Sequence, residues 1–207
     1  MAKLILTADD IANIKYSVTL GHSSWPNAIL DTIKRKIKSH HLERQENCCC
    51  YCNRNIHGEF KMVIDIEHIL PKSKYLRYMF TQKNLSVACK RCNMNIKKSD
   101  LEFLEFPINS ASKRVFRSGF YKFIHPNLDK YDSHLMLNNV QRGRKRLIKY
   151  NVVNESRKGA FTYKYFKLEA LELNSFDIAQ GATERTEIND TEINLEFETL
   201  VKKLNSQ

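Results

Sequence analysis

The feature that most constrains this chain is the distribution of its cysteines, which all fall in two short segments. Cys49-x-x-Cys52 and Cys89-x-x-Cys92 are two equally spaced pairs with 36 residues between them. Two intervening residues let a tight turn bring both thiolates to one metal, and two such turns complete a tetrahedral tetrathiolate. The spacing therefore predicts a structural zinc site made by Cys49, Cys52, Cys89 and Cys92. The spacing Cys48-x-x-x-Cys52 also suits zinc, and we favour Cys49 because it repeats the spacing of the second pair.

The alternative to zinc binding is a set of disulfides, which persist in oxidising compartments. The N-terminal segment turns acidic at Asp9 and Asp10 before an apolar signal-peptide core can form. No apolar run approaches the roughly 20 residues that span a bilayer. We therefore expect a cytoplasmic protein with reduced cysteines and no membrane partner.

Charge is the second constraint, because the chain of 207 residues carries a formal net charge of +11. Residues 167–207 hold nine acidic and four basic residues, a net charge of −5, so the rest of the chain carries +16. Such a field attracts polyanions, above all nucleic acid. The same charge would also serve solubility or binding to an anionic membrane surface.

The segment between the cysteine pairs predicts a strand over residues 63–69, where β-branched residues dominate until Pro71. Alternation places Asp65 and Glu67 on one face of this strand and His68 on the other. A short helix is expected over residues 93–98, at the second cysteine pair. We predict an α+β fold with an N-terminal helical segment (1–47), a zinc-stabilised core (48–106) and a mixed C-terminal extension with an acidic tail (107–207).

Several residues of the central segment follow one another in a recognisable order. The chain reads Glu67-His68-Ile-Leu-Pro71-Lys-Ser73, then Asn84-Leu85, and then Asn93 nine residues after Asn84. With the flanking cysteine pairs, this order resembles the HNH endonuclease family, whose core is the ββα-metal (His-Me finger) unit. The resemblance covers about residues 48–100. Glu67 stands where many members have Asp, and Asn93 where many have His.

The resemblance implies a role for each of these residues. His68 would be the general base that takes a proton from the attacking water, and Asn84 would fix the loop that orients it. Glu67 and Asn93 would bind a catalytic Mg²⁺ or Mn²⁺, because carboxylate and amide oxygens suit these hard cations. Imidazole suits proton transfer near neutral pH. Lys97 or Lys98 would contact neighbouring phosphates.

Two further basic segments are candidates for nucleic-acid contact. A helix is expected over residues 27–43, with Ile29, Ile33 and Ile37 every four residues. Its basic residues make either a solvated face or a nucleic-acid contact, and His40 and His41 are expected to cap the helix or lie on its surface. The denser cluster that we expect to contact phosphates is Arg142, Arg144, Lys145 and Arg146. The aromatic residues that follow it, Phe161, Tyr163 and Tyr165, alternate as in a strand and are expected to pack in the core.

Residues 123–134 contain two His and two Asp, which allows either a second metal site or an ordinary turn, and we favour the turn. This segment also resembles one that follows the HNH core in nuclease subunits of Septu-type and retron-linked anti-phage systems. That resemblance implies an ATPase partner subunit. Residues 191–204 have the pattern of an amphipathic helix, which could dock on its own domain, bind a partner or shield the basic face.

The resemblance implies a metal-dependent HNH endonuclease of a bacterial defence or restriction system, with DNA as the expected substrate. The sequence leaves the choice between DNA and RNA open. The rival hypothesis is a non-catalytic zinc-knuckle adaptor that binds nucleic acid, which would need neither the Glu67-His68 pair nor Asn84 and Asn93. A third is a nuclease that cuts only when held by its ATPase partner.

Overall fold

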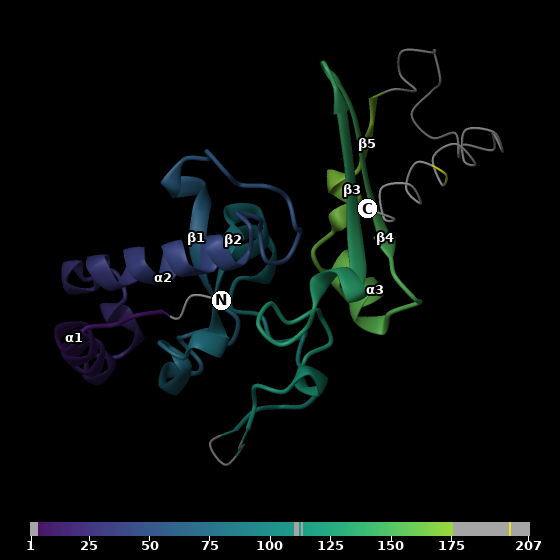
Figure 1. The fold of residues 1–207 in the computed structure, drawn as a ribbon. Coiled ribbons are helices and arrows are strands. Elements are labelled where there is room, and N and C mark those ends of the chain that lie inside the picture. The colour runs from purple at the N-terminus through teal and green to yellow at the C-terminus, as the bar shows by residue number, and fades with distance from the viewer. Residues whose placement is uncertain (1–3, 110–111, 113, 176–198, 200–207) are drawn as a thin grey trace. The chain divides into compact units, whose positions relative to one another are not determined.

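The computed structural model describes residues 4–109, 112, 114–175 and 199, and it contains both helices and antiparallel sheets, which confirms the predicted α+β class (Figure 1). The chain forms two compact units. The first comprises Met1–Asn138 and Lys149–Leu171, and the second comprises Asn139–Ile148 and Glu172–Gln207. The boundaries that we predict at residues 47 and 106 stay a prediction. The amphipathic segment predicted at 191–204 lies outside the described residues, except for Thr199.

Two helices open the first unit. Helix α1 (Ala8–Thr19) begins at a capping box in which the Thr7 side chain accepts from the Asp10 amide and the Asp10 carboxylate accepts from the Thr7 amide. Helix α2 (Asp31–Arg44) follows a short 3₁₀ turn, close to the predicted range. Its residues Ile33 and Ile37 are buried in a cluster with Leu30 and Leu85.

His41 lies one turn beyond Ile37 on the same face of α2 and is only 1% exposed. The expectation that His41 lies on the surface or caps the helix is therefore wrong. Ile33, Ile37 and His41 follow one another at intervals of four residues, so all three lie on the buried face of the helix. Neither ring nitrogen of His41 has a hydrogen-bond partner, and burial lowers the pKa of the imidazole to about 3.

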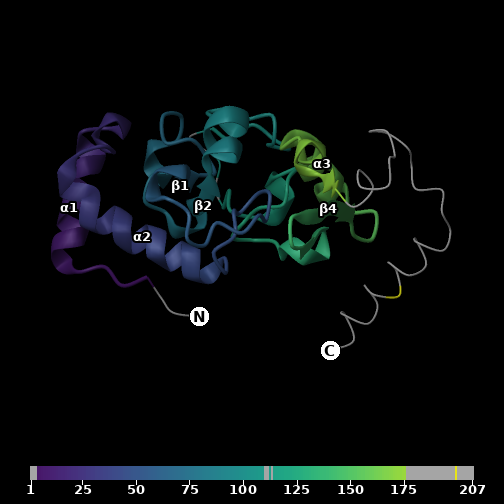
Figure 2. The ribbon, with the colours of Figure 1, turned by 90° about the horizontal axis from the view of Figure 1, so that it is seen from above.

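The centre of the first unit is an antiparallel hairpin of β1 (Ile64–His68) and β2 (Leu85–Cys89), in which Glu67 pairs with Ser86 and His68 with Leu85. Helix α2 crosses this hairpin (Figure 2), and Ile66 packs against the apolar cluster of α2. The other face of β1 meets a π-helical segment, Arg91–Lys97, where Asn93 contacts Asp65 and Lys97 contacts Glu67. The hairpin is thus covered on both faces, and its alternation agrees with the sequence pattern.

The later part of the chain forms a three-stranded sheet in the order β3 (Leu135–Arg142), β4 (Lys145–Val152), β5 (Leu173–Asn174). Helix α3 (Arg157–Tyr165) holds Phe161, Tyr163 and Tyr165, so the strand predicted for these aromatics is wrong. Ser156 caps α3 by accepting from the Gly159 amide, a start signal that outweighs the short alternating pattern. No described helix is long and apolar enough to cross a membrane.

Packing by the aromatic residues ties this later part to the first cysteine pair. Tyr51 lies between Cys49 and Cys52 in the sequence, and its side chain is fully buried. Its ring stacks on Phe166 with 4.2 Å between centroids. The Tyr131 hydroxyl donates to the Tyr51 carbonyl at 3.1 Å, and the Tyr150 hydroxyl donates to the Cys52 carbonyl at 2.6 Å. The first cysteine loop is therefore held by residues up to 115 positions further along the chain.

Candidate metal centre and active site

The four cysteines of the two Cys-x-x-Cys pairs are brought together by the hairpin. The sulfur atoms of Cys49, Cys52, Cys89 and Cys92 all lie within 4.8 Å of one another, and all four residues are buried. The Cys52 and Cys89 sulfurs are 3.9 Å apart, close to the edge of about 3.8 Å that zinc–sulfur bonds of about 2.3 Å give in a tetrahedron. The Cys89 amide also donates to the Cys49 sulfur at 3.3 Å. These four thiolates suit a structural zinc ion, and the group includes Cys49 rather than Cys48.

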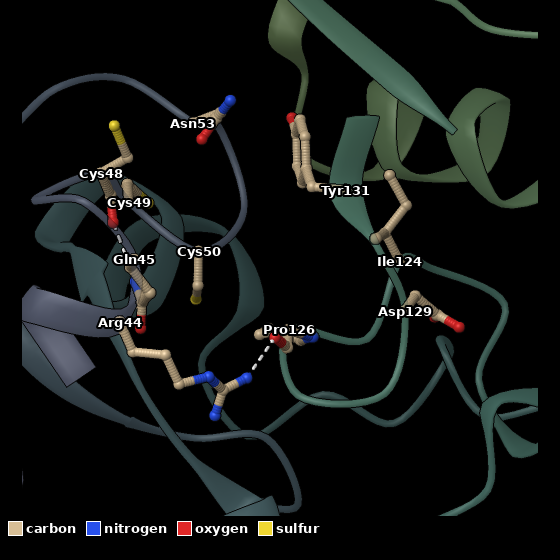
Figure 3. A pocket seen from close by; sticks show the side chains of 10 residues that line it. All are labelled: Arg44, Gln45, Cys48, Cys49, Cys50, Asn53, Ile124, Pro126, Asp129 and Tyr131. Atoms are coloured by element: carbon tan, nitrogen blue, oxygen red, sulfur yellow. Dashed lines mark hydrogen bonds between the residues drawn. The ribbon is translucent and has the colours of Figure 1, made fainter. Parts of the chain in front are cut away.

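Cys48 and Cys50 are not part of this group. Figure 3 shows their side chains pointing in opposite directions beside a small pocket of about 150 Å³ between the cysteine loop and residues 124–131. The Arg44 guanidinium spans this pocket and donates to the Pro126 carbonyl at 3.1 Å. Gln45 donates from its amide to the carbonyls of Cys48 and Val87, both at 2.8 Å, which fastens the end of α2 to the cysteine loop and to β2.

His68 ends β1 and is 7% exposed, at the wall of a groove of about 450 Å³. Its Nε2 lies 3.1 Å from the Met79 carbonyl, which can only accept, so Nε2 carries the proton and Nδ1 is left as the acceptor. Burial, helped by the charge of Lys72, lowers the pKa of His68 to about 3. The imidazole is therefore neutral at physiological pH, with Nδ1 unprotonated.

Asn84 holds the loop that follows His68. Its side-chain oxygen accepts from the Leu70 amide at 2.7 Å, and its Nδ2 donates to the carbonyls of Leu70 and Tyr78, both at 3.0 Å. Its own carbonyl accepts from the Ile69 amide at 2.9 Å. All four bonds go to the backbone of the segment between β1 and β2. Asn84 therefore fixes the turn that directly follows His68.

The Glu67 side chain, which projects from β1 of the hairpin, is buried rather than open to solvent. Its Oε1 receives two hydrogen bonds, from the Lys97 ammonium at 2.7 Å and from the Tyr51 hydroxyl at 2.9 Å. Burial raises the pKa of Glu67, and the Lys97 charge opposes that shift. Lys97 also donates to the His68 carbonyl at 3.1 Å. One carboxylate thus joins the first cysteine loop, the hairpin and the helix after the second cysteine pair.

Asp65 and Asn93 are in contact at the same groove. Asp65 precedes Glu67 by two residues on β1, and Asn93 precedes Lys97 by four residues in the segment Arg91–Lys97. The Asn93 Nδ2 donates to Asp65 Oδ2 at 3.2 Å. Asp65, Glu67, His68 and Asn93 all line the groove. These carboxylate and amide oxygens are hard ligands of the type that Mg²⁺ and Mn²⁺ prefer. Among the described residues, the four cysteines are the one group of three or more His, Cys, Asp or Glu side chains close enough to hold a metal.

The residues predicted to contact phosphates differ in their exposure to solvent. Lys97 is fully buried, so the expectation that it contacts phosphates is wrong, because a lysine that neutralises a buried carboxylate cannot reach a surface ligand. Lys98 is exposed and lines the groove. The other predicted contacts, Arg142, Arg144, Lys145 and Arg146, are all exposed at the β3–β4 turn, in the second unit.

Residues 123–134 form the turn that we favour over a metal site. The Asp129 carboxylate accepts from the His125 amide at 2.7 Å and from the Lys158 ammonium at 2.6 Å. The Asn127 side chain donates to the carbonyls of Leu85 and Lys83 at 2.7 and 3.0 Å, which caps the start of β2. The polar residues of this segment are therefore used in holding the hairpin.

Sequence reasoning missed three residues of the groove. Trp25 lies edge-on to His68 with ring centroids 4.5 Å apart, and Lys72 lies 5.9 Å from the Trp25 ring. Asp65 was placed on the correct face without a role. Trp25 stands 43 positions before His68, and no local motif connects the two. No local pattern predicts the contact between Asp65 and Asn93 either, because it depends on the packing of the segment Arg91–Lys97 against β1.

Part of the chain is similar to a protein of a known anti-phage system. The chain is 40% identical over 60 residues to Septu protein PtuB of Bacillus thuringiensis. The match covers 29% of this chain and 23% of that protein. No protein-family model matches the chain.

Proposed function

We propose that this protein is a metal-dependent HNH endonuclease that hydrolyses phosphodiester bonds in nucleic acid, with DNA as the expected substrate. One observation carries the proposal: a histidine, two carboxylates and an asparagine amide line a single groove, and Asn84 fixes the loop beside the histidine. A binding protein would need none of these groups in this arrangement.

In this proposal His68 accepts the proton of the attacking water at Nδ1, while the Met79 carbonyl holds the ring through Nε2. Asp65, Glu67 and Asn93 are the residues that would hold a Mg²⁺ or Mn²⁺ ion. When bound, such an ion would stabilise the charge that develops on the phosphate and the leaving oxygen. Asp65 joins the set expected from the sequence because it touches Asn93, whereas Oε1 of Glu67 is engaged by Lys97 and Tyr51. Lys72 and Lys98 would neutralise phosphates at the rim.

The biological setting that we propose is a Septu-type anti-phage system, in which the nuclease works with an ATPase partner subunit. The partial identity with Septu protein PtuB supports this setting, and so does the order of residues 123–134 in the sequence. A cytoplasmic location belongs to the same proposal.

The test is plasmid cleavage with Mg²⁺ or Mn²⁺, by the protein alone and together with the proposed ATPase partner subunit. His68→Ala is expected to lower the cleavage rate by at least about 100-fold, because general-base catalysis contributes that much. His57→Ala is the matched control, since His57 is exposed and lies outside the groove. Asp65→Asn is expected to weaken Mn²⁺ binding, measured by electron paramagnetic resonance, as well as cleavage.

Equal cleavage by wild type and His68→Ala would contradict the catalytic assignment. Nucleic-acid binding without cleavage by either protein, with or without the ATPase, would favour the zinc-knuckle adaptor. Unchanged Mn²⁺ binding by Asp65→Asn would remove Asp65 from the metal set and leave Glu67 and Asn93.

A further inference from the structure

A second hollow adjoins the groove that holds His68. It has a volume of about 650 Å³ and shares Trp25, Asp65 and Ile66 with that groove. Three residues belong to both walls, so the two hollows lie side by side along β1, and we refer to them together as the channel. The proposed catalytic residues occupy one end of this channel, and the other end lies against helix α2.

The α2 end of the channel is lined by three cations of one helix, Lys34, Arg35 and Lys38. Lys34 pairs with Asp31 at 2.7 Å and donates to the Trp25 carbonyl, and Lys38 donates to the Ile64 carbonyl at 2.5 Å. These contacts hold both ammonium groups at the wall of the channel. Arg35 is exposed and donates through Nη2 to the Thr32 hydroxyl, which leaves other guanidinium donors for a ligand.

The fourth cation of this run lies elsewhere. Lys36 pairs with Asp10 of α1 at 2.5 Å and does not line the channel. Because successive residues of a helix point in different directions, Lys36 contacts α1, whereas the other three cations of the run line the second hollow.

Trp25 stands where the two hollows meet. The connector between α1 and α2 fixes it, because the Ser24 hydroxyl donates to the carbonyls of Ser17 and Gly21 at 2.8 and 2.7 Å. The indole is half-buried and meets the His68 ring edge-on. Aromatic rings beside a basic channel are the platforms on which unpaired bases stack, at about 1–3 kcal/mol per base.

We propose that the nucleic-acid strand leaves the catalytic groove past Trp25 and continues along α2, with its phosphates on Arg35, Lys34 and Lys38 and a base against the indole. The proposal rests on the nuclease function and adds the path of its substrate. Asp31 and Asp65 also line the channel, but Lys34 neutralises the first and the second belongs to the proposed metal set. The Arg35 guanidinium remains as positive charge on the α2 wall.

The experiment uses Trp25 as its own reporter, because it is the single tryptophan of the chain. The full-length protein carrying His68→Ala is titrated with a fluorescein-labelled single-stranded DNA of about 16 nucleotides. Binding is followed at once by tryptophan emission and by anisotropy of the label, at several salt concentrations. We expect quenching of Trp25 with the same midpoint as the anisotropy change. Arg35→Glu is expected to weaken binding about tenfold or more and to lower the salt dependence by roughly one phosphate contact.

Lys15→Glu is the matched control, because it makes the same change of net charge at an exposed site of α1 outside the channel. Equal weakening by Arg35→Glu and Lys15→Glu would overturn the proposed path, as would tight binding that leaves Trp25 emission unchanged. Arg35→Gln, with a thermal melt of each variant, separates loss of the contact from loss of the fold. A wild-type protein that cleaves DNA while these results fail would refute the path alone, whereas absence of both binding and cleavage would refute the nuclease function.

Discussion

The cysteine cluster and the His68 groove are built from the same hairpin, yet they depend on the sequence in different ways. The cluster takes all four residues from two local motifs, and each motif makes its own tight turn. The groove takes residues from the α1–α2 connector, β1, the loop after it and the helix after the second cysteine pair. A site made of local turns is specified by spacing, whereas a site made of distant elements is specified by the packing that brings them together.

The largest expected effect concerns the cluster. Cys92→Ser removes one ligand, and we expect loss of bound zinc and of cooperative folding, because structural zinc contributes about 10–16 kcal/mol in small zinc domains. Zinc content by elemental analysis and thermal unfolding by circular dichroism measure both effects. Cys48→Ser is the control and should retain zinc and melting temperature, since Cys48 lies outside the cluster. A Cys92→Ser protein that keeps its zinc and its transition would contradict the assignment.

The comparison between two adjacent lysines, the buried Lys97 and the exposed Lys98 of the groove, gives the next effect. Lys97→Met leaves the Glu67 carboxylate buried without its partner, and we expect a loss of about 3–5 kcal/mol in the free energy of unfolding. Lys98→Met changes an exposed side chain and should cost less than about 0.5 kcal/mol. Urea denaturation measures both. If the double variant Glu67→Leu/Lys97→Met is no more stable than Lys97→Met, the cost does not come from the unpaired carboxylate.

The smallest effect tests the buried end of α2. The unfolded His41 imidazole binds a proton below about pH 6.5, whereas the folded one stays neutral down to about pH 3. The unfolded state therefore takes up more protons, and stability falls as the pH is lowered from 7 to 5, by about 2 kcal/mol for this residue. His41→Leu should remove that share from the pH dependence of urea unfolding. His57→Leu, at an exposed histidine, is the control, and a slope in His41→Leu equal to that of the wild type would contradict the burial argument.

The sequence predicted what depends on neighbours along the chain. The α+β class and the approximate range of α2 are confirmed, and β1 falls within the β-branched run, whereas β2 has no counterpart among the elements predicted from the sequence. The strand predicted for Phe161, Tyr163 and Tyr165 is wrong, because the helix that begins at the Ser156 cap overrides their alternation. The sequence could not predict that Lys97 is buried and Lys98 exposed. Burial depends on which side of a short helix faces a carboxylate on another element.

The stacking of Tyr51 on Phe166 has a consequence for how the protein is made. Every residue of the proposed active site has been translated by Ser99, but the ring that buries the back of the Glu67 pocket arrives 67 residues later. A nascent chain thus carries the groove residues before the stack of Tyr51 on Phe166 can form. Synthesis proceeds from the N-terminus, so this contact must wait until α3 has been translated. Under the proposed nuclease function, this order would delay the moment at which a newly made molecule can cut nucleic acid.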